Sequence, residues 1–289
     1  MKSIEGLIKV LNLEQKTENE FIGISKTIGS PNVFGGQVLA QALSAADKSI
    51  TNNRVLHSLH AYFLEAGNLE LPIRYLVTVM RDGGSFSTRR VTAKQGDKTI
   101  FILAASFHKK EKGHEHQVKF ESAIKQPEEL LSWGDILAQF GDFLPKKMKH
   151  FLEIERPIEF KPTFIVNPLD QKDLPPFSDV WFKIKGNTSG FNLALKQQIL
   201  TYISDYNILN STLYPNASIA NFGNTQMASL DHSMWFFREF DLDDWMLYKT
   251  ESPNAFGARG FARGNIYSRT GELIASVAQE GLMRPIKKQ

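Results

Sequence analysis

The chain contains 289 residues, of which 42% are hydrophobic and 22% are charged, with a formal net charge of +3 and no cysteine. A chain of this length can bury a sizeable core as one large or two smaller domains, and its composition is that of an ordinary globular protein. The lack of cysteine excludes a disulfide scaffold, a thiolate zinc site and a cysteine nucleophile. The small net charge argues against a nucleic-acid partner.

No secretory or membrane signal is recognisable in the sequence. An acidic residue, Glu5, precedes any apolar run at the N-terminus, which is unlike a signal peptide. No stretch approaches the roughly 18 apolar residues that a membrane span needs. The C-terminal Lys287-Lys288-Gln289 is not a Ser-Lys-Leu-type peroxisomal address. We therefore expect a cytoplasmic protein without a membrane span.

The N-terminal third predicts helices followed by strands. Apolar residues recur at helical spacing over residues 1–15, and residues 37–50 are rich in Ala, Leu and Gln without proline. Short apolar segments separated by turn-type residues then predict four strands, at residues 60–64, 73–80, 86–94 and 99–108. A long helix followed by antiparallel strands is an α+β unit.

The next seventy residues look different. A charged loop at residues 109–116 is followed by repeated prolines up to residue 176, with one possible short helix at residues 128–140. The helix-then-strand order then returns, with a strand at 180–184, a helix at 191–206 and strands at 227–237, 245–251, 256–268 and 273–284. We predict an N-terminal unit at residues 1–110, a connection at 111–178 and a C-terminal unit at 179–289.

A short sequence motif occurs once in each unit. His57-Ser58-Leu59 in the first unit returns about 175 residues later as His232-Ser233-Met234. A repeat of this length indicates two fused copies of one structural unit, since solenoid repeats are far shorter. Fusion allows one copy to keep its chemistry while the other loses it.

Several longer segments resemble one known family. They are Phe-Gly-Gly-Gln-Val at residues 34–38, His-Ser-Leu-His-Ala-Tyr-Phe at 57–63, Asp-His-Ser-Met-Trp-Phe at 231–236, Ala-Arg-Gly-Phe at 258–261 and Gln-Glu-Gly-Leu-Met-Arg at 279–284. From about residue 7 to residue 284 the chain resembles the type II acyl-CoA thioesterases. The resemblance implies an α+β double hotdog fold, in which two helix-wrapped antiparallel sheets form one continuous sheet.

The resemblance also implies an activity. Members of this family hydrolyse fatty acyl-CoA to free fatty acid and CoA, with broad medium to long chain tolerance and without a metal or cofactor. Their water-based mechanism uses an Asp, a Thr or Ser, and a Gln from the second hotdog. Carried onto this sequence, these residues are Asp205, Ser229 and Gln279.

The chemistry of these residue types fits that role. An ionised Asp can accept a proton from water, while Ser and Gln both donate and accept and can hold the water on its line of attack. Each residue also has an ordinary alternative: Asp205 could cap its helix, and Ser229 could be a packed hydroxyl in a strand. An inward amide at Gln279 is less usual, because it must find buried partners.

When the two units are aligned on His57 and His232, they differ at the positions of the three candidate catalytic residues. Arg54 then falls opposite Ser229, and roughly Phe107 falls opposite Gln279, while Asp47 falls near the helical counterpart of Asp205. The first unit therefore has at most one of the three groups, and we expect one working site per chain.

Four further residues are candidates for substrate or oxyanion binding. Gly35, Gly36 and Gln37 stand at a predicted helix start, where free amides can receive an oxyanion or a phosphate, although a tight turn explains the glycines equally well. Arg259 could meet the phosphates of CoA.

The other motifs in the sequence give weaker evidence for a function. Adjacent His and Ser side chains on a strand point to opposite faces, which argues against a nucleophile–base pair at either copy of the repeat, and no Gly-x-Ser-x-Gly elbow occurs. His114 and His116 lie in a lysine-rich loop and predict a solvated surface, not a metal site. The alternatives that remain open are a silent acyl-CoA-binding module and a hotdog enoyl-CoA hydratase or dehydratase. Exposed sheet edges lead us to expect a homodimer or homotetramer.

Overall fold

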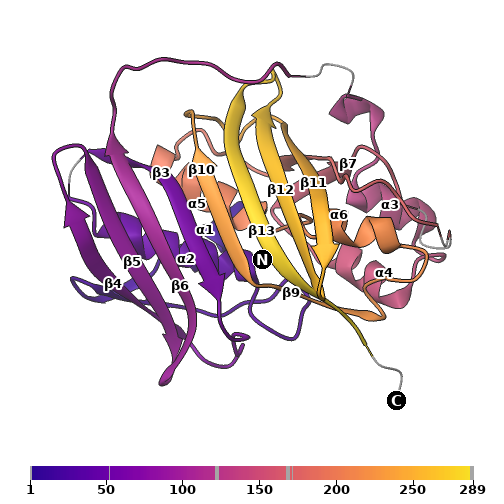
Figure 1. The fold of residues 1–289 in the computed structure, drawn as a ribbon, viewed down its shortest axis with the longest axis horizontal. Coiled ribbons are helices and arrows are strands. Elements are labelled where there is room, and N and C mark those ends of the chain that lie inside the picture. The colour runs from indigo at the N-terminus through magenta and orange to yellow at the C-terminus, as the bar shows by residue number, and fades with distance from the viewer. Residues whose placement is uncertain (1, 52, 121–123, 167–169, 171, 287–289) are drawn as a thin grey trace.

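The computed structural model describes all residues except 1, 52, 121–123, 167–169, 171 and 287–289. Residues 1 and 287–289, used above for targeting, therefore lie outside the described part. The described residues form one 13-stranded sheet with the order β1-β2-β4-β5-β6-β3-β10-β13-β12-β11-β8-β7, and β9 pairs with β13 beside this path. Figure 1 shows the sheet face-on, with helices α2 and α5 behind it.

The first half begins with a helix whose apolar side faces the core. Ser3 caps α1, and its buried side includes Leu7 and Leu11. All four predicted strands are present, and β3 begins earlier than expected, at Arg54. A short hairpin, β1–β2, was not predicted. The elements of this half are α1 Ile4–Leu11, β1 Glu14–Thr17, β2 Glu20–Gly23, α2 Gly35–Lys48, β3 Arg54–Phe63, β4 Ile73–Asp82, β5 Phe86–Gln95 and β6 Lys98–Lys109.

The connection between the two halves, predicted at residues 111–178, contains more secondary structure than its prolines indicate. The single helix predicted at residues 128–140 is two elements, because Ser132 and Asp135 form a capping box that starts a new helix. A strand that was not predicted, β7, pairs with β8 of the second half. The elements are η1 Pro127–Glu129, α3 Trp133–Phe140, α4 Lys146–Glu153 and β7 Ile158–Pro162.

The second half repeats the order of the first. The strand predicted at residues 227–237 is broken at Leu230, whose backbone N–H donates to Glu280 and whose carbonyl accepts from Phe63. The break lets β9 pair with β13 alone, while β10 pairs with both β13 and β3. The elements are β8 Val180–Ile184, α5 Leu193–Ser204, α6 Asn210–Leu213, η2 Tyr214–Asn216, β9 Thr225–Ser229, β10 Asp231–Phe236, β11 Met246–Phe256, β12 Arg259–Ser268 and β13 Leu273–Pro285.

The two halves are related by their strand order and register. Read outward from the central β3–β10 pair, each half has the same succession of strands. Ser58 pairs with Ser106 in the first half, and Ser233 pairs with Ala278 in the second. Phe107 therefore corresponds to Gln279, as the repeat predicted.

The central helices pack against each other inside the curved sheet. Every residue of α2 from Gly36 to Ala46 is buried, as expected for a helix enclosed by sheet and a second helix. Its many alanines leave little side-chain bulk between the elements, which allows close approach. Among the described residues, no helix is long and apolar enough to cross a membrane.

Candidate active site

Three side chains from separate segments of the second half meet in one hydrogen-bonded group. Ser229 Oγ donates to Asp205 Oδ1 at 3.2 Å. Gln279 Nε2 donates to the same carboxylate oxygen at 3.1 Å and to Ser229 Oγ at 2.8 Å. The structure thus brings together the three residues that the sequence singled out.

Asp205 is positioned by the end of a helix. It is the C-cap of α5, and the chain turns away at Asn207, which has a left-handed φ of 64°. Burial raises the pKa of Asp205 to about 6, opposed by hydrogen bonds from Gln279, Ser229 and the backbone N–H of Gly36. A carboxylate with a pKa closer to neutrality is a stronger base than an ordinary one.

Gln279 and Ser229 are held by neighbouring strands. Gln279 lies on β13 opposite Ala262, on the inner face of the sheet, and has no exposed surface. Ser229 is the last residue of β9, directly before the break at Leu230, and pairs with Gly281. Both groups are carried by sheet backbone, which holds them more rigidly than loops would.

The first half contributes a helix start to this site. A Cβ on Gly35 would lie 2.7 Å from Asp205 Oδ2, and a Cβ on Gly36 would lie 2.5 Å from the carbonyl oxygen of Tyr202. Only glycine permits such an approach of α2 to the end of α5. The N-terminal end of α2 also carries partial positive charge, which stabilises the carboxylate of Asp205.

Two predicted binding residues are not brought to this group. Gln37 is fully buried, and its Nε2 donates to the carbonyl of Ile24 at 2.7 Å and to Gln41 Oε1 at 3.2 Å. Arg259 is exposed on the outer side of β12, while the neighbouring inner positions are buried, and it pairs with Glu280 at 3.0 Å. Gln37 therefore joins α2 to the segment after β2, and Arg259 faces away from Asp205.

The first half has none of the three groups at the matching positions. Ser49 is the C-cap of α2, so it corresponds to Asp205, and Asp47 lies two residues earlier. Arg54 corresponds to Ser229, because each pairs with the equivalent strand position, Lys109 or Gly281.

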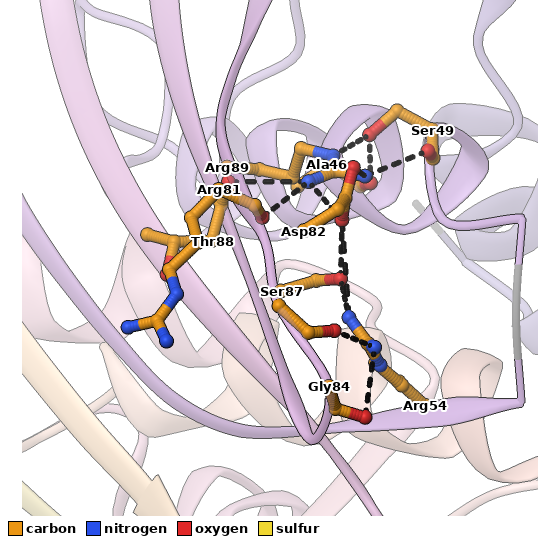
Figure 2. Close-up of polar contacts among 10 residues, drawn as sticks. Ala46, Ser49, Arg54, Arg81, Asp82, Gly84, Ser87, Thr88 and Arg89 are labelled. Atoms are coloured by element: carbon orange, nitrogen blue, oxygen red, sulfur yellow. Dashed lines mark hydrogen bonds and ion pairs between the residues drawn. The ribbon is translucent and has the colours of Figure 1, made fainter.

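An ion-pair network occupies this region of the first half (Figure 2). Arg89 donates to Asp82 through both Nη atoms, at 3.0 and 3.1 Å, and to Ser49 Oγ through Nε at 2.9 Å. Arg54 donates to Ser87, which in turn donates to Asp82. The hydrogen bonds that Asp82 accepts, first from Arg89 and then from Ser87, lower its pKa. The cluster is a structural ion pair, and it offers no unpaired base.

His57 and His60 do pair with serines, but across strands. His57 Nε2 lies 2.8 Å from Ser106 Oγ, and His60 Nδ1 lies 2.9 Å from Ser233 Oγ. Neither pair joins neighbours on one strand. Ser106 and His60 alternate with buried inward residues, so both pairs lie on the outer face, opposite the side that carries Gln279.

One neighbour of the site was not assigned from the sequence. His232 is fully buried on β10, and its Nδ1 lies 2.5 Å from Gln279 Oε1. The signal available was a histidine in an otherwise apolar inward-facing set, which must find a polar partner. No group of three or more His, Asp or Glu in the described residues is arranged to hold a metal ion.

The fold and site define a class of protein. Two helix-wrapped antiparallel halves joined edge to edge are a double hotdog. The structure superposes on a hot dog fold protein of unknown function from Alicyclobacillus acidocaldarius with a TM-score of 0.77, at 13% identity over 98% of this chain and 99% of that one.

Sequence comparisons give the family. Residues 25–108 match the family model of the acyl-CoA thioesterase N-terminal domain, and residues 147–282 match that of acyl-CoA thioesterase. The chain is 40% identical to acyl-CoA thioesterase 2 of Haemophilus influenzae over 97% of this chain and 98% of that protein. An acyl-CoA thioesterase II structure from Mycobacterium marinum is 33% identical, with a TM-score of 0.78, over 96% of this chain and 98% of that one. The chain belongs to the acyl-CoA thioesterase family, which confirms the resemblance and the expected fold.

The raised pKa of Asp205 predicts the pH dependence that a reaction using this carboxylate as its base should have. A general base acts in its ionised form, so activity should be lost as pH falls through the pKa. Because burial raises that pKa to about 6, we expect kcat/KM to decline below about pH 6 and to reach a plateau above it. A pH profile in constant-ionic-strength buffers tests this. An acidic limb near pH 4 would mean that an unperturbed carboxylate, or none, is involved.

Proposed function

We propose that this protein hydrolyses fatty acyl-CoA thioesters to free fatty acid and CoA by direct attack of water. The observation that supports the proposal is the mutual hydrogen bonding of Asp205, Ser229 and Gln279 at distances of 2.8 to 3.2 Å. An alignment of a base with two orienting groups suits a single water molecule.

The three groups have two different roles in this reaction. Ser229 and Gln279 orient the water, and Asp205 accepts its proton as the oxygen attacks the thioester carbonyl carbon. The carbon–sulfur bond then breaks, CoA leaves as a thiolate, and the proton held by Asp205 is released. The N–H of Gly36 donates to Asp205, so we assign polarisation of the carbonyl oxygen to the neighbouring amide in the first turn of α2, that of Gly35.

Release of free thiol from acyl-CoA tests the activity. We propose a broad range of medium to long acyl chains, so octanoyl-CoA and palmitoyl-CoA should both release thiol. Binding of palmitoyl-CoA without thiol release would favour a silent binding module instead. Hydration of an enoyl-CoA in preference to thiol release would favour a hotdog hydratase.

The hydroxyl at residue 229 can be tested by a matched pair. Ser229→Ala removes a donor to Asp205 and a partner of Gln279, and we expect kcat to fall about 10- to 100-fold through loss of water orientation. Ser229→Thr keeps the hydroxyl and should retain most of the activity. Equal activity of the two variants would remove Ser229 from the mechanism.

The difference between the halves predicts one site per chain. The matching positions of the first half hold Ser49, Arg54 and Phe107, so they supply neither a base nor an inward amide. We expect calorimetric titration with a non-hydrolysable acyl-CoA analogue to give one equivalent per chain. Two equivalents, with turnover persisting after Asp205→Asn, would contradict this.

We also propose that the protein is a cytoplasmic homodimer or homotetramer. Among the described elements, the sheet ends in short strands, β1 and β7, and its outer face exposes Tyr62 and Phe86, 58% and 40% respectively. These features favour association through the face of the sheet more than through its edges. Light scattering gives the mass in solution.

A further inference from the structure

A buried histidine connects the proposed catalytic group to the interior. His232 has no exposed surface, and both ring nitrogens have partners. Its Nδ1 lies 2.5 Å from Gln279 Oε1, and its Nε2 lies 2.9 Å from Ser204 Oγ. The ring therefore bridges the end of α5, where Ser204 precedes Asp205, to the amide on β13.

The orientation of the Gln279 amide is fixed by chemistry on its two sides. An ionised Asp205 only accepts hydrogen bonds, so the end of the amide that faces it must be the NH2 group. The carbonyl end then faces His232. A buried carbonyl needs a donor, and Nδ1–H of His232 is the group in contact with it.

The same requirement sets the proton on the imidazole. A neutral ring with hydrogen on Nδ1 has a lone pair on Nε2, and this lone pair needs a donor. Ser204 Oγ lies 2.9 Å from Nε2, and its hydroxyl donates to the carbonyl of Thr201 at 2.8 Å. Because a hydroxyl carries one proton, the Nδ1–H form of His232 requires Ser204 to turn this proton from Thr201 to Nε2. Donation then runs in one direction, from Ser204 to His232, from His232 to Gln279 and from Gln279 to Asp205 and Ser229.

We propose that His232 is a positioning residue, which in its Nδ1–H form holds the Gln279 amide with NH2 toward Asp205 and Ser229. The inference rests on the proposed hydrolytic site, because it concerns how that site is kept in one arrangement. Without the Nδ1 donor, the amide can rotate and present its oxygen to the carboxylate. Rotation would remove a donor from Asp205, misalign the water and raise the pKa of the base.

The surroundings of the ring favour the neutral form. Burial lowers the pKa of His232 to about 4, so the ring is uncharged at neutral pH. The other titratable groups facing Asp205 are three tyrosines, Tyr202, Tyr206 and Tyr248, which lie on or after α5 and on β11. Burial raises the pKa of each tyrosine, so none changes charge between pH 5 and 9.

The tautomer can be measured in the unaltered protein. In 15N-labelled protein at pH 7, NMR of the imidazole should show a protonated Nδ1 and an unprotonated Nε2 for His232. A proton on Nε2, or a doubly protonated ring, would overturn the proposal. This measurement needs no substitution, so it decides the question even where a variant fails to fold.

Two substitutions separate positioning from packing. The side-chain nitrogen of Asn overlays Nδ1 of His, and that of Gln overlays Nε2. His232→Asn should therefore keep the donor to Gln279 and most of kcat. His232→Gln should lose about 10- to 100-fold of kcat with little change in KM, and its acidic limb should move to higher pH.

A double substitution tests whether His232 acts through Gln279. In a Gln279→Ala background, His232→Gln should have no further effect on kcat. Additive losses, equal activity of the His232→Asn and His232→Gln proteins, or an unchanged acidic limb would overturn the positioning role. Asp205→Asn is measured alongside, because activity retained in that variant would refute the hydrolytic site itself and leave the NMR result on His232 standing.

Discussion

We expect Asp205→Asn to abolish most thioesterase activity. The substitution keeps the size of the side chain but removes the base, so kcat for palmitoyl-CoA should fall by about 10²- to 10⁴-fold, the usual contribution of general acid–base catalysis. KM should change little, because the asparagine still fills the space between α2 and α5. Steady-state thiol release measures both constants.

Asp47→Asn is the matched control. Asp47 is also a carboxylate near the end of a central helix, and burial raises its pKa to about 6 as well. The first half lacks an inward amide beside this carboxylate, however, since Phe107 stands at the position that corresponds to Gln279. Activity of Asp47→Asn should therefore equal that of the parent protein. Equal losses in the two variants would show that a buried carboxylate matters for folding and not for catalysis.

The second large effect concerns the glycines at the start of α2. In Gly35→Ala the new methyl group would lie 2.7 Å from Asp205 Oδ2 and 3.0 Å from Phe63 Cε1. The carboxylate must rotate away from Ser229 and Gln279, and we expect kcat to fall by about 100-fold, as for a misplacement of about 1 Å. The unfolding free energy should change less, because a side-chain oxygen can move.

Gly36→Ala should damage the fold as well as the activity. Its methyl group would lie 2.5 Å from the Tyr202 carbonyl oxygen, which belongs to the α5 backbone and cannot rotate aside. Separation of the two helices should lower the free energy of unfolding by about 1–3 kcal/mol, the usual result of overpacking. Denaturant unfolding measures this loss beside kcat.

Gly134→Ala provides the control for both glycine variants. Gly134 is the second residue of α3, as Gly36 is of α2, but a Cβ there would meet only Ser132 Oγ, at 3.5 Å. We expect unchanged activity and equal or slightly higher stability. If Gly36→Ala behaved like Gly134→Ala, the close approach of α2 to α5 would not be needed.

The sequence predicted the longer strands and missed three short ones, β1, β2 and β7. All residues of β1 are exposed, so the strand has no apolar alternation to detect. In β7 the buried Ile158 and Phe160 do alternate, but the prolines on both sides place the segment within the predicted connection between the two units. The break at Leu230 depends on backbone bonds to Glu280 and Phe63, which only the folded sheet brings near.

The contacts of the site residues, like the break at Leu230, could not be predicted from the sequence. Asp205, Ser229 and Gln279 could be named from the family resemblance, but their contact depends on the joint placement of α5, β9 and β13. The side chain of Gln37 could not be placed from the sequence, because a residue one position after Gly36 turns to a different side of the helix. Its contact with Ile24 belongs to the tertiary structure.

A single-turnover reaction in 18O-labelled water tests the central claim most directly. With enzyme in excess over palmitoyl-CoA, attack by the water held at Asp205, Ser229 and Gln279 should place one labelled oxygen in the released fatty acid. The peptide containing Asp205 should remain unlabelled. Unlabelled fatty acid together with 18O in Asp205 would show attack by the carboxylate itself, and would contradict the account.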